Sequence, residues 1–159
     1  MVNVDNKAFY TVRGYELLEK NKKLLTSAME DYLEMIYRNS LKEGYIRINR
    51  LAELLNVKAS SASKMVQKLG ELGMLNYEKY GIITLTEGGR AVGEYLLERH
   101  KIIEAFLKFL GCDNDILVQT ELLEHNMNAN TVENINILIK FFDSNTDISN
   151  KFKNFKEKF

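Results

Sequence analysis

Residues 48–86 of the chain are INRLAELLNVKASSASKMVQKLGELGMLNYEKYGIITLT. The spacing of apolar residues predicts two helices separated by a three-residue turn, the second ended by Gly73, and then two strands joined by a short turn. These elements span 48–55, 61–72, 74–77 and 82–86. Helix, turn, helix and β-hairpin are the parts of a winged helix-turn-helix, so the segment predicts a DNA-binding module.

The second of these helices is the one that enters the major groove, so its first turns should carry small or polar side chains. Hydroxyls and small side chains can contact base edges, while lysines serve phosphate or guanine, and the hairpin tip suits a backbone contact. The predicted DNA-binding residues are Ala59, Ser60, Ser61, Ser63, Lys64, Gln67, Lys68 and Lys79. The alternative interpretation is that the serines only cap the helix and the lysines form a solvated face.

Helices are predicted on both sides of this module. Upstream, Thr26 or Ser27 caps a helix, with Glu30 in the position of a capping box. Downstream, apolar periodicity predicts a long helix to about Leu110 and two further helices at 116–126 and 131–142. The fold class is therefore mainly α with a small β-hairpin wing. The predicted organisation is an N-terminal extension at 1–24, a winged helix-turn-helix domain at 25–90, a helical domain at 91–142 and a C-terminal tail at 143–159.

Composition narrows the class of protein. The net charge of the 159 residues is zero, but residues 1–90 carry 14 Lys and Arg against 11 Asp and Glu, while residues 91–142 carry 4 against 8. This asymmetry is expected if one half meets phosphate and the other holds cations. No apolar run reaches the ~18–20 residues that span a bilayer. The N-terminus does not resemble a signal peptide, and Cys112 is the single cysteine. We therefore expect a cytoplasmic protein with no membrane partner.

The two histidines of the chain both lie near carboxylates on predicted helices. Glu121, Glu124 and His125 share one helical stripe, because residues three and four apart are neighbours on a helix. His100 ends another charged stretch, and Asp31 and Glu34 are neighbours on the upstream helix. An oxygen and nitrogen donor set without thiolate suits Mn²⁺ or Fe²⁺ better than a structural zinc site, and six donors allow a paired site.

Two other readings of these residues remain open at this point. A histidine beside a glutamate is more often a surface ion pair than a metal ligand, which would leave a metal-independent winged-helix regulator. A di-metal oxidase or hydrolase on a helical bundle would need two Glu-x-x-His pairs. The residues three before the histidines are Leu97 and Leu122, so this signature is absent. Neither a nucleophile–base pair nor a Gly-rich phosphate loop is present. We therefore expect no catalytic residues and no enzyme activity.

Taken together, several motifs resemble the diphtheria toxin repressor family, and most closely its short branch, the manganese transport regulators. The motifs are SAMEDYLEMIY at 27–37, SSASKMVQKL at 60–69, YEKY at 77–80, RH at 99–100 and ELLEH at 121–125. The resemblance covers about residues 25–142. It implies a homodimer with a winged helix-turn-helix domain and a helical metal-binding and dimerisation domain. Such a repressor binds operator DNA when loaded with divalent metal and controls metal-uptake genes.

The resemblance also implies a ligand set. One metal would be held by Asp31, Glu121, Glu124 and His125, and a second by Glu34 and His100 with Glu121 and Glu124 as bridges. This predicts Mn(II), with two ions per subunit, and Fe(II) as the alternative cofactor of an iron-responsive repressor. The iron-sensing branch would carry methionine at 31 and cysteine at 121. The loop from Gly111 to Glu121 is one residue shorter than in relatives, and the chain ends before the SH3-like third domain of the longer branch.

Two further expectations concern apolar residues. We expect the helix at 91–110 and the segments after Gly111 to form a two-fold dimer seam, because their apolar surface is too large for one helical layer to bury. The predicted seam residues are Leu96, Leu97, Ile103, Phe106 and Leu107. In the tail, Phe152, Phe155 and Phe159 either pack an extra helix or stay disordered among lysines.

Overall fold

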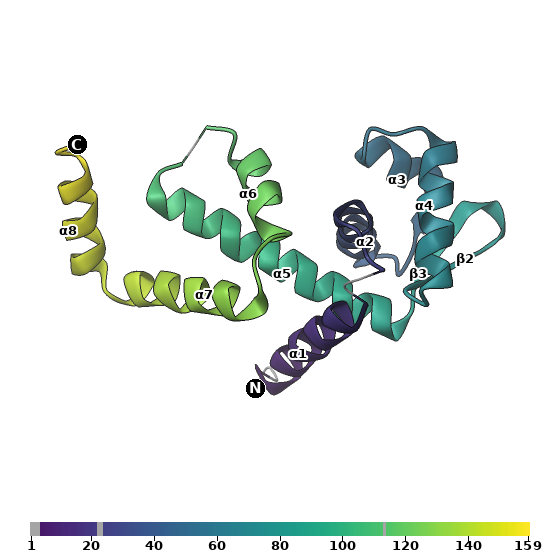
Figure 1. The fold of residues 1–159 in the computed structure, drawn as a ribbon, viewed down its shortest axis with the longest axis horizontal. Helices are drawn as coiled ribbons and strands as arrows, with labels where there is room; N and C mark the ends of the chain where they lie inside the picture. The colour runs from purple at the N-terminus through teal and green to yellow at the C-terminus, as the bar shows by residue number, and fades with distance from the viewer. Residues whose placement is uncertain (1–3, 22–23, 113) are drawn as a thin grey trace. The chain divides into compact units, whose positions relative to one another are not determined.

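The computed structural model describes residues 4–21, 24–112 and 114–159. The chain divides into two compact units, residues 1–98 and residues 99–159. Helix α5, Glu87–Leu110, belongs to both, since its first half lies in the first unit and its second half in the second (Figure 1).

The helices of the first unit agree with the predicted pattern. They are α1 Val4–Asn21, α2 Ser27–Ser40, α3 Ile48–Leu54 and α4 Ala59–Glu71. Thr26 is the N-cap of α2, and its hydroxyl oxygen accepts the N–H of Met29 at 3.3 Å. Helix α4 begins at Ala59, two residues before the predicted start. Helix α1 lies within the predicted N-terminal extension.

The sheet has one more strand than the sequence predicted. The strands are β1 Ile46–Arg47, β2 Leu75–Tyr77 and β3 Ile82–Leu85, with the 3₁₀ turn η1 Lys79–Gly81 between β2 and β3. They pair antiparallel in the order β1-β3-β2, with Ile83 opposite both Ile46 and Tyr77. A strand of two residues shows no alternation, so β1 was missed. Tyr80 and Gly81 turn the wing with left-handed φ values of 64° and 73°.

The core of the first unit lies where the apolar faces of its helices meet the sheet. Helices α2, α3 and α4 contact one another, and α4 also packs on β2. Each fully buried Leu or Ile stabilises the unit by about 1.5–3 kcal/mol relative to exposure. The side chains with no exposed surface include Leu33, Ile36, Leu51, Val66, Leu69 and Ile83. The recognition helix α4 is thus fixed on its inner face.

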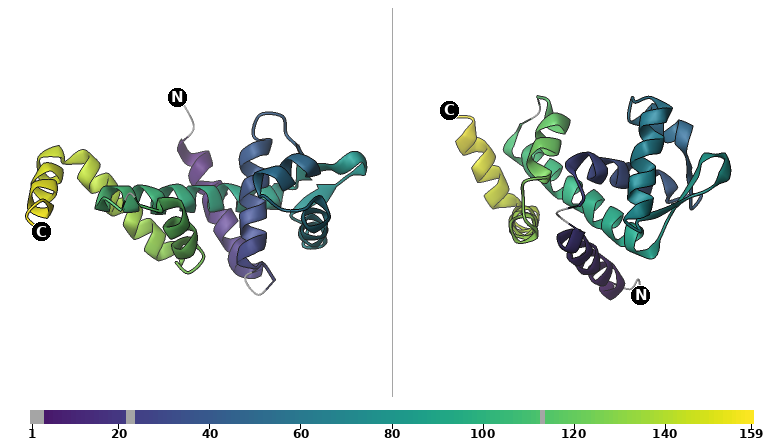
Figure 2. Two further views of the ribbon diagram at one scale, coloured as in Figure 1. Left: turned by 90° about the horizontal axis from the view of Figure 1, so that it is seen from above. Right: turned by 45° about the vertical axis from the view of Figure 1, so that its right-hand side comes forward.

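The first half of α5 is approached closely by three segments of the first unit. A Cβ at Gly89 would lie 1.7 Å from the carbonyl oxygen of Met74, before β2. A Cβ at Gly93 would lie 2.5 Å from Cβ of Tyr37 in α2. A Cβ at Gly14 of α1 would lie 2.2 Å from the carbonyl oxygen of Ala91. Figure 2 shows α1 beside the first half of α5. Glycine at these positions is therefore required by backbone proximity rather than by flexibility.

The second unit is helical. Besides the end of α5 it contains α6 Ile116–Glu124, α7 Ala129–Ser144 and α8 Thr146–Lys156. Its buried cluster joins Ile103 and Leu107 of α5 to Val132 of α7. Phe152 of α8 stacks on Phe109 with ring centroids 5.2 Å apart. The tail therefore forms a helix that packs on the domain, while Phe155 and Phe159 are exposed.

The prediction of which α5 residues form the two-fold dimer seam is wrong. Four of its members are buried within the protomer: Leu96, Leu97, Ile103 and Leu107, exposed by 0%, 8%, 0% and 5%. They belong to the core, and the fifth, Phe106, is half-buried. The exposed large apolar side chains described in the second unit lie elsewhere: Leu117, Val118 and Leu122 of α6, Ile137, Leu138 and Phe141 of α7, and Ile148, Phe155 and Phe159 further along the chain.

Among the described residues, no helix combines the length and the apolar character that crossing a membrane requires.

Candidate metal centre and nucleic-acid interface

The outer face of α4 carries the predicted DNA-binding residues. Ala59, Ser60 and Ser61 form its first turn and are exposed, and Lys64, Gln67 and Lys68 follow on the solvent side. Lys79 is exposed at the start of the wing turn. The tight turn between α3 and α4 contains Asn56, whose φ is 51°. Small, hydroxyl and cationic groups thus share one accessible face, as major-groove contact requires.

Ser63 differs from the other predicted DNA-binding residues. It is half-buried, and its hydroxyl shares a hydrogen bond of 3.1 Å with the Tyr77 hydroxyl. Since Tyr77 belongs to β2, this bond ties the recognition helix to the wing. The hydroxyl of Ser63 therefore already has a partner inside the protein.

In the second unit, two of the predicted ligands form a buried pair. His100 on α5 and Glu124 at the end of α6 are 8% and 1% exposed. Nδ1 of His100 lies 3.0 Å from Oε2 of Glu124. A histidine ring nitrogen and a carboxylate oxygen are both ligand atoms for divalent cations, so this pair places two such atoms side by side. A buried carboxylate costs stability unless it is paired or binds metal, which makes Glu124 the central donor.

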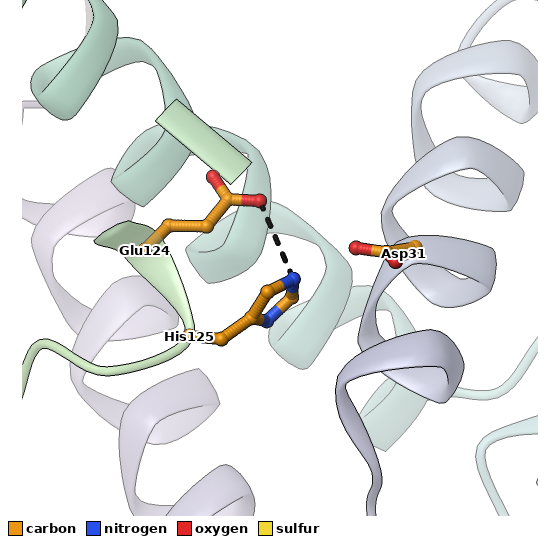
Figure 3. A group of neighbouring side chains, drawn as sticks. All are labelled: Asp31, Glu124 and His125. Carbon is orange, nitrogen blue, oxygen red and sulfur yellow. Dashed lines mark ion pairs between the residues drawn. The ribbon is translucent and has the colours of Figure 1, made fainter. Parts of the chain in front are cut away.

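His125 adds a second imidazole beside the same carboxylate. Its Nε2 lies 3.8 Å from Oε1 of Glu124, the ion pair dashed in Figure 3. Arg99 lies on its other side, with a guanidinium nitrogen 3.4 Å from Nδ1 of His125. Sequence reasoning did not assign Arg99 a role, although it directly precedes His100. Groups that hydrogen-bond to a ligand fix its orientation, and Arg99 is placed to do this for the His125 ring.

Glu121 lies one turn before Glu124 on α6, three residues away. Its side chain is exposed, in contrast to the buried Glu124. The structure thus brings His100, Glu124 and His125 together in the second unit. Glu121 belongs to neither group of potential metal ligands found among the described residues.

The two remaining predicted ligands lie on α2 of the first unit. Asp31, also drawn in Figure 3, and Glu34 are three residues apart on this helix. Glu34 is 9% exposed and forms an ion pair with Arg38 one turn later. The helix therefore presents two carboxylates, one of them nearly buried.

The phenols of α2 add no negative charge to these carboxylates. Burial raises the pKa of the Tyr32 hydroxyl above its ordinary value. Burial also raises the pKa of the Tyr37 hydroxyl, Glu94 and Glu98 raise it further, and Arg90 lowers it. Both phenols therefore stay protonated at neutral pH.

The donor chemistry fits a hard or borderline divalent cation. Carboxylate oxygens and imidazole nitrogens are present, and no thiolate belongs to the group. This set suits Mn²⁺ or Fe²⁺.

Comparison with known proteins finds two family models that match successive parts of the chain. Residues 24–83 match the family model "Iron dependent repressor, N-terminal DNA binding domain", and residues 86–153 match "Iron dependent repressor, metal binding and dimerisation domain". The HTH-type transcriptional regulator MntR of Lysinibacillus sphaericus is 40% identical over 129 residues, which is 80% of this chain and 93% of that protein. MntR of Bacillus subtilis is 37% identical over 85% of this chain and 96% of its own length.

Solved structures are similar as well. The manganese regulator SloR has a TM-score of 0.63 at 29% identity, and the metal-dependent transcriptional regulator MtsR has 0.65 at 28%. Each match covers 74% of this chain and 55% of the other, so this chain spans about half the length of these structures. With a DNA-binding domain followed by a metal-binding and dimerisation domain, the chain is a metal-dependent transcriptional regulator and not an enzyme, and it belongs to the diphtheria toxin repressor, or iron-dependent repressor, family.

Proposed function

We propose that the chain is a manganese-responsive repressor, which binds double-stranded operator DNA in the cytoplasm as a homodimer when loaded with Mn²⁺ and controls metal-uptake genes. The observation that carries the proposal is the fully buried Glu124, 3.0 Å from His100, within a metal-binding domain. The similarity to MntR proteins and to a manganese regulator supports manganese as the metal.

The proposed ligands are those that the family resemblance implies. Asp31, Glu121, Glu124 and His125 would hold one ion, and Glu34 and His100 would hold a second, with Glu121 and Glu124 shared. The binding of two ions per subunit is part of this proposal. Isothermal titration calorimetry of the full chain with Mn²⁺ should give two bound ions per subunit.

The proposed coupling rests on electrostatic repulsion between carboxylates. Asp31 and Glu34 belong to the unit that carries α4, whereas Glu121 and Glu124 belong to the other unit. When bound, a dication supplies the positive charge that offsets this repulsion. With the metal bound, the carboxylates of both units favour one arrangement of the two domains. The free energy of this preference cannot exceed the difference in metal-binding free energy between the two arrangements. Such coupling is typically about 1–3 kcal/mol.

The direct test is selection of duplexes by the full chain from a random pool, in Mn²⁺ and in chelator. We expect a half-site pair enriched only with Mn²⁺, with half-sites about one helical turn apart. Fluorescence anisotropy on the selected duplex then measures affinity in both conditions. Equal affinity in chelator and in Mn²⁺ would instead identify a metal-independent winged-helix regulator.

Metal choice gives a separate prediction. Mn²⁺ binds less tightly than later metals to almost any site, so selectivity must come from coordination number and geometry. We expect Mn²⁺ to activate operator binding best, Fe²⁺ weakly, and Zn²⁺ to bind tightly but activate poorly because it prefers four ligands. Asp31→Met should shift activation toward Fe²⁺, measured by anisotropy at matched metal occupancy.

Glu30→Met, on the same turn of α2, is the matched control and should leave the metal preference unchanged. Full activation of the wild type by Fe²⁺ but not by Mn²⁺ would overturn the manganese assignment and favour an iron-responsive repressor.

The homodimer requires an exposed apolar surface, and α6 supplies one. Leu117, Val118 and Leu122 are 56%, 54% and 67% exposed, and Val118 and Leu122 share a helical face because they are four residues apart. We therefore place part of the dimer contact on α6. Leu122→Asp should weaken the dimer at least about tenfold, because a buried unpaired carboxylate is costly. Sedimentation equilibrium of the full chain measures this.

Leu41→Asp is a control of similar exposure, at 54%, outside the dimerisation domain. It should leave the dimer constant unchanged. A Leu122→Asp protein that dimerises as tightly as the wild type would exclude α6 from the contact.

A further inference from the structure

A hollow of about 320 Å³ lies in the first unit, where the end of α2, strand β1 and the start of α3 meet. Its polar lining comprises Asn39, Lys42, Glu43, Arg47 and Arg50. All five side chains are on exposed residues, so the hollow opens to solvent. None of them belongs to the metal donors or to the residues predicted to contact DNA through α4 and the wing.

The charges of this hollow favour an anion. Lys42, Arg47 and Arg50 contribute three cations, and Glu43 is the single carboxylate in the lining. Arg50 also pairs with Glu53 at 3.1 Å, but the two side chains are 62% and 68% exposed. Solvent screens an ion pair this exposed, so it contributes little to stability and Arg50 can turn toward another anion.

The place of the hollow in the fold identifies the anion. Strand β1 leads directly into α3, the first helix of the helix-turn-helix. In such modules the second helix lies in the major groove while the first helix crosses the DNA backbone. Arginine side chains are suited to phosphate because their planar donors form paired, charge-assisted hydrogen bonds.

We propose that Lys42, Arg47 and Arg50 hold a backbone phosphate of the bound DNA in this hollow. This inference rests on the proposed operator binding and adds an anchor separate from α4 and the wing. Because phosphate contacts fix position without reading sequence, the hollow sets the register of the protein on DNA rather than its base preference.

The first test measures how operator affinity depends on salt, using the full Mn²⁺-loaded chain and the duplex it selects. Each lost phosphate contact lowers the slope of log affinity against log salt by about 0.9. Arg47→Gln and Arg50→Gln should each reduce affinity several-fold and lower this slope, with the selected sequence unchanged. Glu43→Gln should raise affinity, since it removes the carboxylate that lines the hollow. Lys151→Gln, on exposed α8, is the matched control and should change neither quantity.

The second test identifies the phosphate. Single phosphates of the selected duplex are replaced by neutral methylphosphonates, one position at a time. We expect that methylphosphonate at one position in each half-site weakens operator binding by the wild type but not by the Arg47→Gln protein. Such a result would show that Arg47 and that phosphate are coupled. Additive losses at every position, or an unchanged salt slope in the arginine variants, would overturn the proposal.

A free anion is the competing occupant. If inorganic phosphate stabilises the wild type but not Arg47→Gln, while operator affinity is the same for both, the hollow binds a small anion and the proposal is wrong. Failure of the wild type to select any duplex would count against the proposed function itself. The two failures are therefore distinguishable.

Discussion

Replacing Glu124 by glutamine is expected to abolish the stimulation of operator binding by Mn²⁺. The substitution keeps the shape of the side chain and an oxygen that can accept the hydrogen bond of His100. It removes the negative charge that a dication needs at the centre of the buried group. Operator affinity in Mn²⁺ should fall by about 5–150-fold, the range of typical coupling free energies, to the value seen in chelator. Anisotropy on the selected duplex and calorimetry with Mn²⁺ measure both effects.

Glu133→Gln makes the same change of charge on the exposed face of α7 and should leave both measurements unaltered. Circular dichroism and sedimentation check that the Glu124→Gln protein remains a folded dimer. Mn²⁺-stimulated binding by that folded variant, at wild-type strength, would remove Glu124 from the metal centre.

Replacing Gly89 by alanine is expected to destabilise the first unit severely. The added Cβ would lie 1.7 Å from the carbonyl oxygen, 2.6 Å from the carbonyl carbon and 3.1 Å from Cα of Met74. These are all backbone atoms, so relief requires moving β2 away from α5. Overpacking of this kind costs about 1–3 kcal/mol and occasionally more, and we expect the upper end. Urea denaturation monitored by circular dichroism measures the decrease in the free energy of unfolding.

The adjacent glycine provides the control. A Cβ at Gly88 would meet only Cδ1 of Leu17 at 3.7 Å and Oγ1 of Thr86 at 3.9 Å, which are ordinary contacts. Alanine is favoured over glycine by about 1 kcal/mol within a helix, so Gly88→Ala should match or exceed wild-type stability. Equal losses in the two variants would show that helix propensity, not proximity to Met74, governs both positions.

Periodic apolar residues allowed most of the fold to be predicted. Apolar residues three and four apart predict the helix pair and the long helix of 24 residues, and apolar residues two apart predict the hairpin strands. Strand β1 is too short for any period. The identity of Leu96 and Ile103 as core residues was missed because periodicity shows which face is apolar, not what covers it.

The candidate metal centre was predicted by residue type but not by environment. Glu121 and Glu124 are the same residue on one helix, yet one is exposed and the other is 1% exposed. Spacing alone makes them equivalent. The difference arises from how α6 packs against α5 in the second unit, which local sequence does not encode. The role of Arg99 beside His125 was hidden for the same reason.

The hydrogen bond between Ser63 and Tyr77 bears on how the protein tolerates variation in DNA shape. A wing tied to the recognition helix cannot follow the two grooves independently. Any mismatch between protein and duplex must then be absorbed by bending or groove widening in the DNA, at a cost that depends on how stiff that sequence is. Base pairs that no side chain touches would therefore influence affinity, and flexible pyrimidine–purine steps would be favoured between the two contacted half-sites.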